Sequence, residues 1–426
     1  MSEPGTQSAK LITPARLVAF VCAAQVLVQI GAFFWPALLP EMIPRWSLSN
    51  SQAGWITAAF YGAYMVSVPV LVTLTDRIDP KRIYLFGVGA TVVGHLLFAL
   101  YAEGFWSALV FRSLTGLGWA GTYMTGLKLL ADRVDAKLMS RAVTGHAASI
   151  GISGALSFAT GDLLARSGGW QTAFYAAGIS AAVAWLLVAL LVPAQAKKAA
   201  KPADDGQGTF DFRPVFRNRS AMAYATAYCV HTLEMSALRG WAVAFLGYVA
   251  ARTGYLGSAV SPAVVATTLG LVGTLASVAG NEAAIRYGRR RLISLAMLAS
   301  IGLAAVLGYA GSYSYPLAVG LLLVYSIIVW LDSSSLTAGA AGTAEPSRRG
   351  ATLAVHSMLG YAGGFVGPLI VGWALDLSGG MSPAGWTAAF ASVAALMVLA
   401  LGVFTWIRPQ ELAGDRATGA AAKAKG

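Results

Sequence analysis

Apolar runs of about 20 residues recur along the whole chain of 426 residues. Each run is long enough to form a helix across the roughly 30 Å of hydrocarbon in a bilayer. Only 11% of the residues are charged, whereas soluble domains typically contain about 25%. Because so few polar side chains cannot cover a water-soluble protein of this size, we expect a lipid-facing exterior. The sequence therefore predicts an all-α integral membrane protein.

Twelve transmembrane helices are expected. Backbone groups in lipid must be satisfied within their own segment, which favours helices, and the alternating polarity of a membrane barrel is not visible. The expected spans are residues 16–40, 52–75, 83–103, 105–130, 142–165, 169–193, 220–250, 262–284, 292–311, 315–340, 350–377 and 384–407.

Basic residues are distributed unevenly between the two sides of these spans. Of the 30 Lys and Arg residues, 25 fall on the side that holds both termini. Arg45, Arg166 and Arg252 fall on the other side, and Arg112 and Arg239 fall inside spans. Excess positive charge marks the cytoplasmic side. We therefore expect a multi-pass protein of the bacterial inner (plasma) membrane with both termini cytoplasmic, and we attribute the net charge of +12 to the lipid bilayer rather than to nucleic acid.

The spans divide into two similar halves. A polar stretch separates six spans from six, so we expect an N-terminal six-helix bundle at 1–194, a cytoplasmic linker at 195–219, a C-terminal six-helix bundle at 220–407 and a disordered cytoplasmic tail at 408–426. The start of the sixth span, Gly169-Trp170, recurs at the start of the twelfth as Gly385-Trp386. Two such pseudo-symmetric bundles with a site between them form a known transporter architecture.

Two motifs connect the chain to a family. The loop after the second span reads Asp76-Arg77-Ile78-Asp79-Pro80-Lys81-Arg82, and the fourth span carries Arg112 followed by Gly116 and Gly118. In these residues the chain resembles the major facilitator superfamily of secondary transporters, over nearly its whole length. The family's loop has glycines where this chain has Val72 and Asp79.

The resemblance implies that Asp76, Arg77, Lys81 and Arg82 form a cytoplasmic gate, with the aspartate near the start of the eleventh helix. A carboxylate is stabilised at a helix N-terminus. The alternative is that the loop only anchors the chain by its positive charge. The matching loop after the eighth span has Ile285 in place of the aspartate, and the nearby Glu282 is a candidate substitute.

Arg112 has two interpretations. The resemblance implies a part in proton coupling or in compensating the charge of a substrate, since an arginine inside a bilayer usually faces a cavity or a partner. Alternatively, Arg112 lies only about two turns into its span, so its side chain reaches the outer surface.

The seventh span is the most polar. Tyr228, His231, Glu234 and Arg239 lie within one broad arc of a helix with 100° per residue. We expect this arc to face a central cavity, with Glu234 as a candidate proton carrier. A structural ion pair with the other half is the alternative for Glu234.

The tenth span carries Trp330 and Asp332. Asp332 is a second candidate proton or ion site, or else a partner for Arg239 or Arg112. Residues expected to line the pocket are Gln25, Gln29, Tyr61, Tyr64, Tyr228 and Trp330. His146 and His356 are interpreted as packing histidines, and Asp162 and Asp376 as helix caps or gate residues.

Enzymatic activity is not expected, because the sequence shows no catalytic constellation, metal motif or cofactor motif. We expect a monomer that transports a small-molecule substrate by alternating access, with protons as the coupling ion. Arg112, His231 and Arg239 suit an anion, which favours proton-coupled uptake of a small organic anion. Proton-coupled efflux of drugs or metabolites is the alternative, and a non-transporting membrane receptor is an alternative of another class.

Overall fold

The computed structural model describes residues 13–75, 77–194, 212–255 and 260–415, and these residues contain helices but no strand. The N-terminal bundle consists of α1 (Pro14–Gln29), α2 (Phe34–Arg45), α3 (Asn50–Leu74), α4 (Pro80–Tyr101), α5 (Phe105–Ala131), α6 (Ala136–Gly168) and α7 (Trp170–Leu191). The short α8 (Arg213–Arg217) precedes the second bundle.

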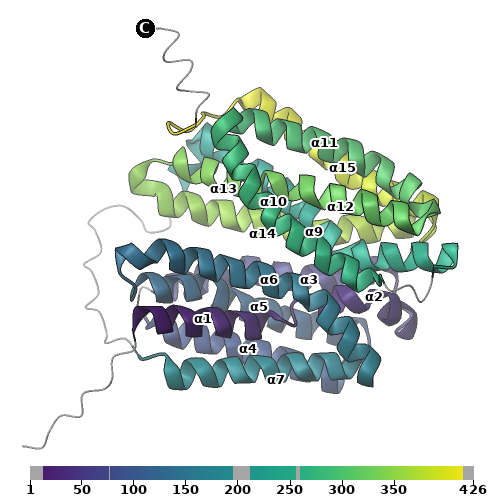
Figure 1. The fold of residues 1–426 in the computed structure, drawn as a ribbon, viewed down its shortest axis with the longest axis horizontal. Helices are drawn as coiled ribbons and strands as arrows, with labels where there is room; N and C mark the ends of the chain where they lie inside the picture. The colour runs from purple at the N-terminus through teal and green to yellow at the C-terminus, as the bar shows by residue number, and fades with distance from the viewer. Residues whose placement is uncertain (1–12, 76, 195–211, 256–259, 416–426) are drawn as a thin grey trace, which may run out of the picture.

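The C-terminal bundle consists of α9 (Arg219–Thr253), α10 (Pro262–Tyr287), α11 (Arg289–Ala310), α12 (Tyr315–Leu331), α13 (Ser333–Gly342), α14 (Arg349–Leu377) and α15 (Pro383–Ile407), with 3-10 turns at Gly311–Tyr313 and Pro346–Arg348. Figure 1 shows the two bundles one above the other, with α1 beginning and α15 ending at the same end of the molecule. We call this the terminal end and the other the opposite end.

Ten helical segments in the described part of the chain are long and apolar enough to cross a membrane. The long helices α5 and α9 are not among the ten. α5 contains Arg112, and α9 contains His231, Glu234 and Arg239. With α1–α2 and α12–α13 taken as one crossing each, the long described helices amount to the expected twelve.

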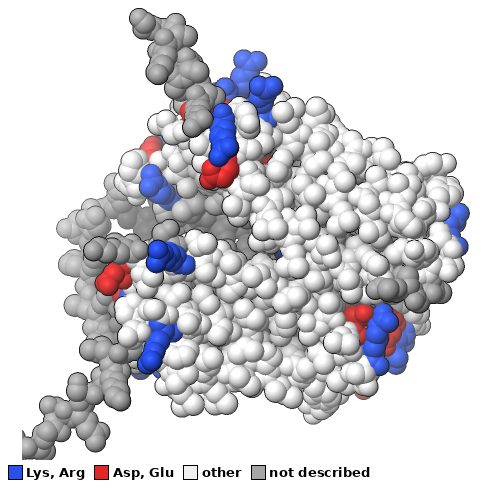
Figure 2. Space-filling model, viewed as in Figure 1, with Lys and Arg blue, Asp and Glu red and all other residues white. Residues whose placement is uncertain are grey.

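The outside of the molecule carries the features of a lipid-facing surface. Large apolar side chains are exposed along the helices, among them Trp106, Leu163, Leu190, Leu275 and Trp406. Figure 2 shows the charged side chains of this face gathered at the two ends, with an uncharged band between them. Exposed apolar surface of this extent indicates contact with a membrane. The expected all-α membrane architecture is confirmed.

Local signals set where several helices begin. Ser49 and Gln52 form a capping box at the start of α3, and Ser261, Ser314 and Ser382 cap α10, α12 and α15. Each of these serines accepts a hydrogen bond from a backbone N–H that would otherwise lack a partner. In α10, α12 and α15 a proline follows in the first turn, where its missing N–H costs nothing.

The repeated Gly-Trp pair has the same place in both bundles. Trp170 begins α7 and packs on Trp46, Phe98 and Phe174. Trp386, in the first turn of α15, packs on Trp241, Phe245 and Phe390. Both indoles are buried. Each repeat therefore places an aromatic core at the opposite end of its own bundle.

Two expected single spans are broken helices. The span at 16–40 is interrupted between α1 and α2, and the span at 315–340 is interrupted at Asp332. Of the tail expected to be disordered at 408–426, Gln410, Glu411 and Asp415 bind the C-terminal bundle, and residues 416–426 lie outside the described residues. Residues 195–211 of the expected linker lie outside the described residues.

Candidate functional site

A buried acid–base pair joins α9 to the break between α12 and α13. His231 Nδ1 lies 2.9 Å from Asp332 Oδ1, and both side chains are buried. The two atoms are at ion-pair distance without the alignment of a hydrogen bond. The structure thus brings together two of the predicted site residues, from helices about 100 residues apart in sequence.

The break at Asp332 has a local cause. Three serines, which are weak helix formers, follow it, and α10 approaches the preceding turn very closely at Gly280. A Cβ atom on Gly280 would lie 1.8 Å from the carbonyl oxygen of Leu331. Only glycine therefore lets α10 pack against this bend, which turns the Asp332 side chain toward His231.

Aromatic and polar side chains extend the pair toward α14. The Tyr228 ring stacks on His231, with centroids 5.6 Å apart, and on His356, with centroids 4.0 Å apart. His356 Nε2 lies 3.1 Å from Thr337 Oγ1 on α13. His356, interpreted from the sequence as a packing histidine, thus lies one ring away from the His231–Asp332 pair.

Glu234 faces a different direction. Its carboxylate accepts hydrogen bonds from the Ser300 hydroxyl on α11 and, at 2.7 Å, from the Tyr325 hydroxyl on α12. These contacts place Glu234 inside the C-terminal bundle and do not join it to Arg239. A single arc on α9 therefore serves two environments, with His231 toward the helix break and Glu234 toward α11 and α12.

Arg239 lies between the two bundles. Its guanidinium lies over the ring of Phe33, just before α2, at 5.1 Å and over the ring of Trp330 of α12 at 4.6 Å. It also interacts with Tyr61 of α3. Within the described part of the chain, no carboxylate lies within ion-pair distance of Arg239. The guanidinium is held by aromatic rings, which leaves its charge without a counter-charge.

Arg112 is buried inside the N-terminal bundle rather than extended to the surface. Its Nη2 donates to the carbonyl of Ala32 at 3.1 Å, and its guanidinium lies 4.6 Å from the centre of the Phe60 ring. Pro36 has no N–H, so the carbonyl four residues earlier, that of Ala32, has no helical donor. Arg112 therefore satisfies a backbone group that the break between α1 and α2 exposes.

The second exposed group of this break is also satisfied. The Phe33 N–H donates to the Ser157 hydroxyl of α6 at 2.9 Å. Other N–H groups of Arg112, at Nε and Nη1, are buried without a hydrogen-bond partner. Arg112 thus has a structural role, and it also has spare donors inside the bundle.

The remaining predicted pocket residues separate into two groups. Gln25 donates to Gln29 at 3.0 Å and accepts from Tyr84 at 3.2 Å, all within the N-terminal bundle. Tyr64 of α3 instead stacks on Tyr361 of α14, with ring centroids 3.5 Å apart. Tyr361 was not singled out from the sequence. The sequence feature that points to Tyr361 is the set of glycines around it, which let α14 approach other helices.

Gate residues at the terminal end make contacts within the N-terminal bundle. Lys81 Nζ donates to the carbonyl of Ala189 at 2.9 Å, and Arg133 pairs with Asp79 at 2.9 Å. Arg77 and Arg82 are exposed, and Asp76 lies outside the described residues. The contacts of Lys81 and Arg133 therefore join parts of the N-terminal bundle to one another and do not involve α14.

Contacts between the bundles follow α3 and α14 from the opposite end to the middle. Asp376 of α14 accepts hydrogen bonds from Asn50 and Ser51 at the start of α3, and Tyr64 meets Tyr361 halfway along. On the other side, the backbone N–H of Ala159 in α6 donates to Thr267 of α10 at 3.0 Å. The structure therefore joins the bundles across the opposite end.

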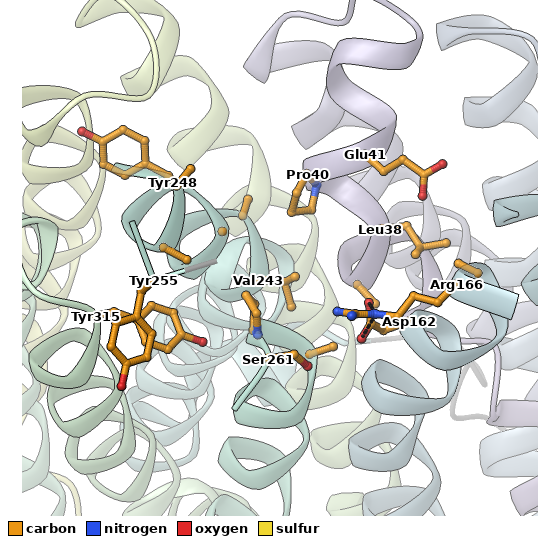
Figure 3. Close-up of a pocket in the computed structure, with 18 of the residues that line it drawn as sticks. Leu38, Pro40, Glu41, Asp162, Arg166, Val243, Tyr248, Tyr255, Ser261 and Tyr315 are labelled. Carbon is orange, nitrogen blue, oxygen red and sulfur yellow. Dashed lines mark hydrogen bonds and ion pairs between the residues drawn. The ribbon is translucent and has the colours of Figure 1, made fainter. Parts of the chain in front are cut away.

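A cavity of about 570 Å³ lies at the opposite end, between α2 and α6 of one bundle and α9, α10 and α12 of the other. Figure 3 shows Asp162 beside Arg166 on the N-terminal side, and Tyr255 beside Tyr315 on the C-terminal side. Its size is within the range of small-molecule pockets. None of the residues predicted to line the pocket borders this cavity.

Comparisons with known proteins agree with this architecture. A model of the Major Facilitator Superfamily matches residues 21–331. Protein spinster homolog 1 of Homo sapiens is 26% identical over 255 residues, which cover 57% of this chain and 48% of that protein. The 4-hydroxybenzoate transporter PcaK of Acinetobacter baylyi is 25% identical over 182 residues, which cover 42% of this chain and 39% of that protein. The chain thus spans about half the length, or less, of these curated relatives.

Solved structures match over nearly the whole chain. A bacterial homolog of the human lysosomal transporter Spinster, inward-facing and occupied, superposes with a TM-score of 0.74 at 16% identity, over 95% of this chain and 98% of that one. The nucleoside transporter NupG superposes with a TM-score of 0.70 at 13% identity, over 92% and 99%. At such identities the likeness shows the fold. Because the family model covers well over half of the sequence, this chain belongs to the Major Facilitator Superfamily of membrane transporters.

Proposed function

We propose that this protein takes up a small organic anion together with protons by alternating access, as a monomer in a bacterial inner membrane. The terminal end would face the cytoplasm, since most basic residues lie there. The observation that carries the proposal is Arg239, a guanidinium between the two bundles with no carboxylate partner among the described residues.

An anion is the ligand that such a site lacks. A charge held away from water is costly unless it is paired, and a guanidinium binds a carboxylate through two parallel hydrogen bonds. Arg239 contacts Phe33 and Tyr61 of one bundle and Trp330 of the other. A substrate bound there would touch both bundles, as alternating access requires.

The aromatic surroundings favour an anion with an apolar or aromatic body. Phe33, Tyr61 and Trp330 lie around the guanidinium. The relative named as a 4-hydroxybenzoate transporter supports the same class, because its named substrate combines a ring with a carboxylate.

The His231–Asp332 pair is the preferred proton carrier. An acid and a base in contact at a helix break can exchange a proton when the break moves, and the pair is buried from bulk water. Glu234 is the second candidate. We rank it below the pair because its carboxylate already accepts hydrogen bonds from Ser300 and Tyr325 within one bundle.

Uptake into proteoliposomes tests the proposal. A panel of labelled aromatic carboxylates, aliphatic carboxylates and neutral solutes would be offered with an imposed pH gradient. We expect an inward proton gradient to drive accumulation of a carboxylate. Arg239→Gln should raise its KM by about 10–100-fold, since a hydrogen bond to a charged group contributes about 1.5–3 kcal/mol.

Arg166→Gln is the matched control, because Arg166 is exposed and pairs within its own helix with Asp162. It should leave KM unchanged. Extrusion of the solute against an opposite gradient would instead indicate efflux. Binding without movement of any solute would indicate a receptor, and transport indifferent to Arg239→Gln would remove the site assignment.

A further inference from the structure

The chain after α15 folds back onto the terminal end of the C-terminal bundle. Arg408 adopts a left-handed conformation (φ 50°), which turns the chain out of the helix. The N–H of Gln410 then donates to Ser220 at 3.1 Å, and its carbonyl accepts from Tyr224 at 2.9 Å. We call residues 410–415 the C-terminal clasp.

The first acid of the clasp caps α11. Glu411 accepts hydrogen bonds from the backbone N–H groups of Arg289 and Arg290, at 2.9 and 3.0 Å. It also accepts from the Arg290 side chain at 3.2 Å. A carboxylate at this position satisfies backbone donors that a helix start leaves open and complements the helix dipole.

The second acid forms a buried ion pair. Asp415 binds Arg289 through both oxygens, at 3.0 Å to Nη2 and 3.2 Å to Nε, and both side chains are 2% exposed. A buried charge of this kind is stable only while its partner is present. Glu411 and Asp415 thus supply two carboxylates beside the loop in which Ile285 stands in place of the family's aspartate, whereas the side chain of Glu282 is exposed.

Arg289 connects the clasp to the helix break through hydrogen bonds. Its Nη1 donates to Asn281 of α10 at 3.0 Å and to the backbone carbonyl of Ser335 of α13 at 3.2 Å. Ser335 lies in the first turn of α13, directly after Asp332 and beside the Gly280 contact. The same guanidinium thus binds the clasp, α10 and α13.

α13 needs such support. Its ten residues, Ser333–Gly342, are mostly Ser, Ala and Gly, and Leu336 is the one large apolar side chain it buries. We propose that Arg289 and the C-terminal clasp are positioning elements that hold α13, and with it the Asp332 side chain, in place against His231. The consequence for proton coupling rests on the proposed function, whereas the proposal that the clasp holds α13 in place does not.

Amide hydrogen exchange of the full-length protein in lipid nanodiscs tests whether the clasp holds α13 in place. In Asp415→Asn, peptides from α13 should exchange at least about tenfold faster, because local opening follows the loss of the contacts that hold a segment. Peptides from α6 and α7 should not change. Glu282→Gln is the control, since it removes an exposed acid from the same end.

Uptake kinetics in the same preparations test the link to function. Asp415→Asn should lower the maximal rate about fivefold or more and leave KM within about twofold, because Arg239 is untouched. Asp415→Glu, which keeps the charge, should restore most of the rate. Should Asp415→Asn fail to fold, Glu411→Gln serves in both measurements.

The outcomes separate the two proposals. Unchanged exchange of α13 in Asp415→Asn or its substitute overturns the positioning role. Faster exchange in a protein whose wild type moves no anion supports the positioning role and rejects the proposed function. A rate loss that Asp415→Glu does not restore, or a KM that rises with it, rejects the link to Asp332.

Discussion

The carboxylate of Asp376, in the last turn of α14, holds Asn50 at the first turn of α3. One oxygen accepts from the backbone N–H of Asn50 at 3.0 Å and from its side-chain amide at 2.8 Å, and the other accepts from the N–H of Ser51 at 2.7 Å. The acid of one bundle therefore caps a helix of the other. Any opening of the opposite end between α3 and α14 must break all three hydrogen bonds.

Asp376→Asn should shift the protein toward an open opposite end. The amide has one acceptor oxygen fewer than the carboxylate and no charge. We expect this loss to destabilise the closed opposite end by about 1.4 kcal/mol, or roughly a tenfold change in the conformational equilibrium. Spin labels at Glu103 and Tyr313, in a background without Cys22 and Cys229, would report the distance between the bundles.

Asp162→Asn provides the comparison for this measurement. Asp162 lies at the same end and pairs with Arg166 of its own helix, so its loss should leave the distance distribution as in the wild type. Equal distributions in all three proteins would show that Asp376 does not restrain opening.

Arg112 and Pro36 should be energetically coupled. Pro36 leaves the Ala32 carbonyl without a helical donor, and Arg112 supplies one. Arg112→Leu should therefore destabilise the protein more in the natural background than in Pro36→Ala, by about 1–2 kcal/mol, which is the cost of an unsatisfied buried carbonyl. A double-mutant cycle on unfolding in mixed micelles measures this difference.

Pro40→Ala is the matched change, because Pro40 lies one turn further along α2 and removes a donor from a different carbonyl. The cycle of Arg112 with Pro40 should be additive. If both cycles were additive, the cap on Ala32 would contribute nothing to stability, and Arg112 would be free for a purely functional role.

The sequence was sufficient for the course of the chain through the membrane. Apolar length, basic residues and the repeated Gly-Trp pair each report on one segment or on two equivalent segments, and those features lead to two bundles. His231 and Asp332 can also be selected from the sequence as candidates, because an ionisable residue inside an apolar span stands out whatever its partner.

The contacts of these residues could not be derived in the same way. The helical period gives the direction of Glu234 relative to His231 but not the neighbour on each side of α9. Similarly, an acidic pair in a polar C-terminal segment resembles any solvated tail. Only the fold shows that Glu411 and Asp415 reach Arg289, since the pairing spans more than 100 residues of sequence.

Asp332→Asn should separate anion exchange from proton coupling. Without an ionisable group beside His231, accumulation driven by a pH gradient should fall to background, whereas exchange of labelled for unlabelled anion should persist, because exchange needs no net proton movement. Both rates are measurable in the proteoliposomes described above.

Glu234→Gln is the informative counterpart of that variant. Its amide can still bind Ser300 and Tyr325 within the bundle, so gradient-driven accumulation should survive. The reverse pattern, with coupling lost in Glu234→Gln and kept in Asp332→Asn, would identify Glu234 as the proton carrier.

Gly280→Ala should destabilise the helix break itself. The new Cβ would meet the Leu331 carbonyl oxygen at 1.8 Å and its carbon at 2.7 Å, so α10 and α12 must move apart. Overpacking of this kind costs about 1–3 kcal/mol and should appear as a lower midpoint of thermal unfolding. Gly302→Ala in α11 has no neighbouring atom within 4 Å, so the same chemical change there should be neutral or slightly stabilising.

A destabilised Gly280→Ala protein that still transports but no longer accumulates its anion would show that the bend, through the placement of Asp332, sets the coupling. Equal midpoints for the two alanine variants would contradict the close approach of α10 to the break.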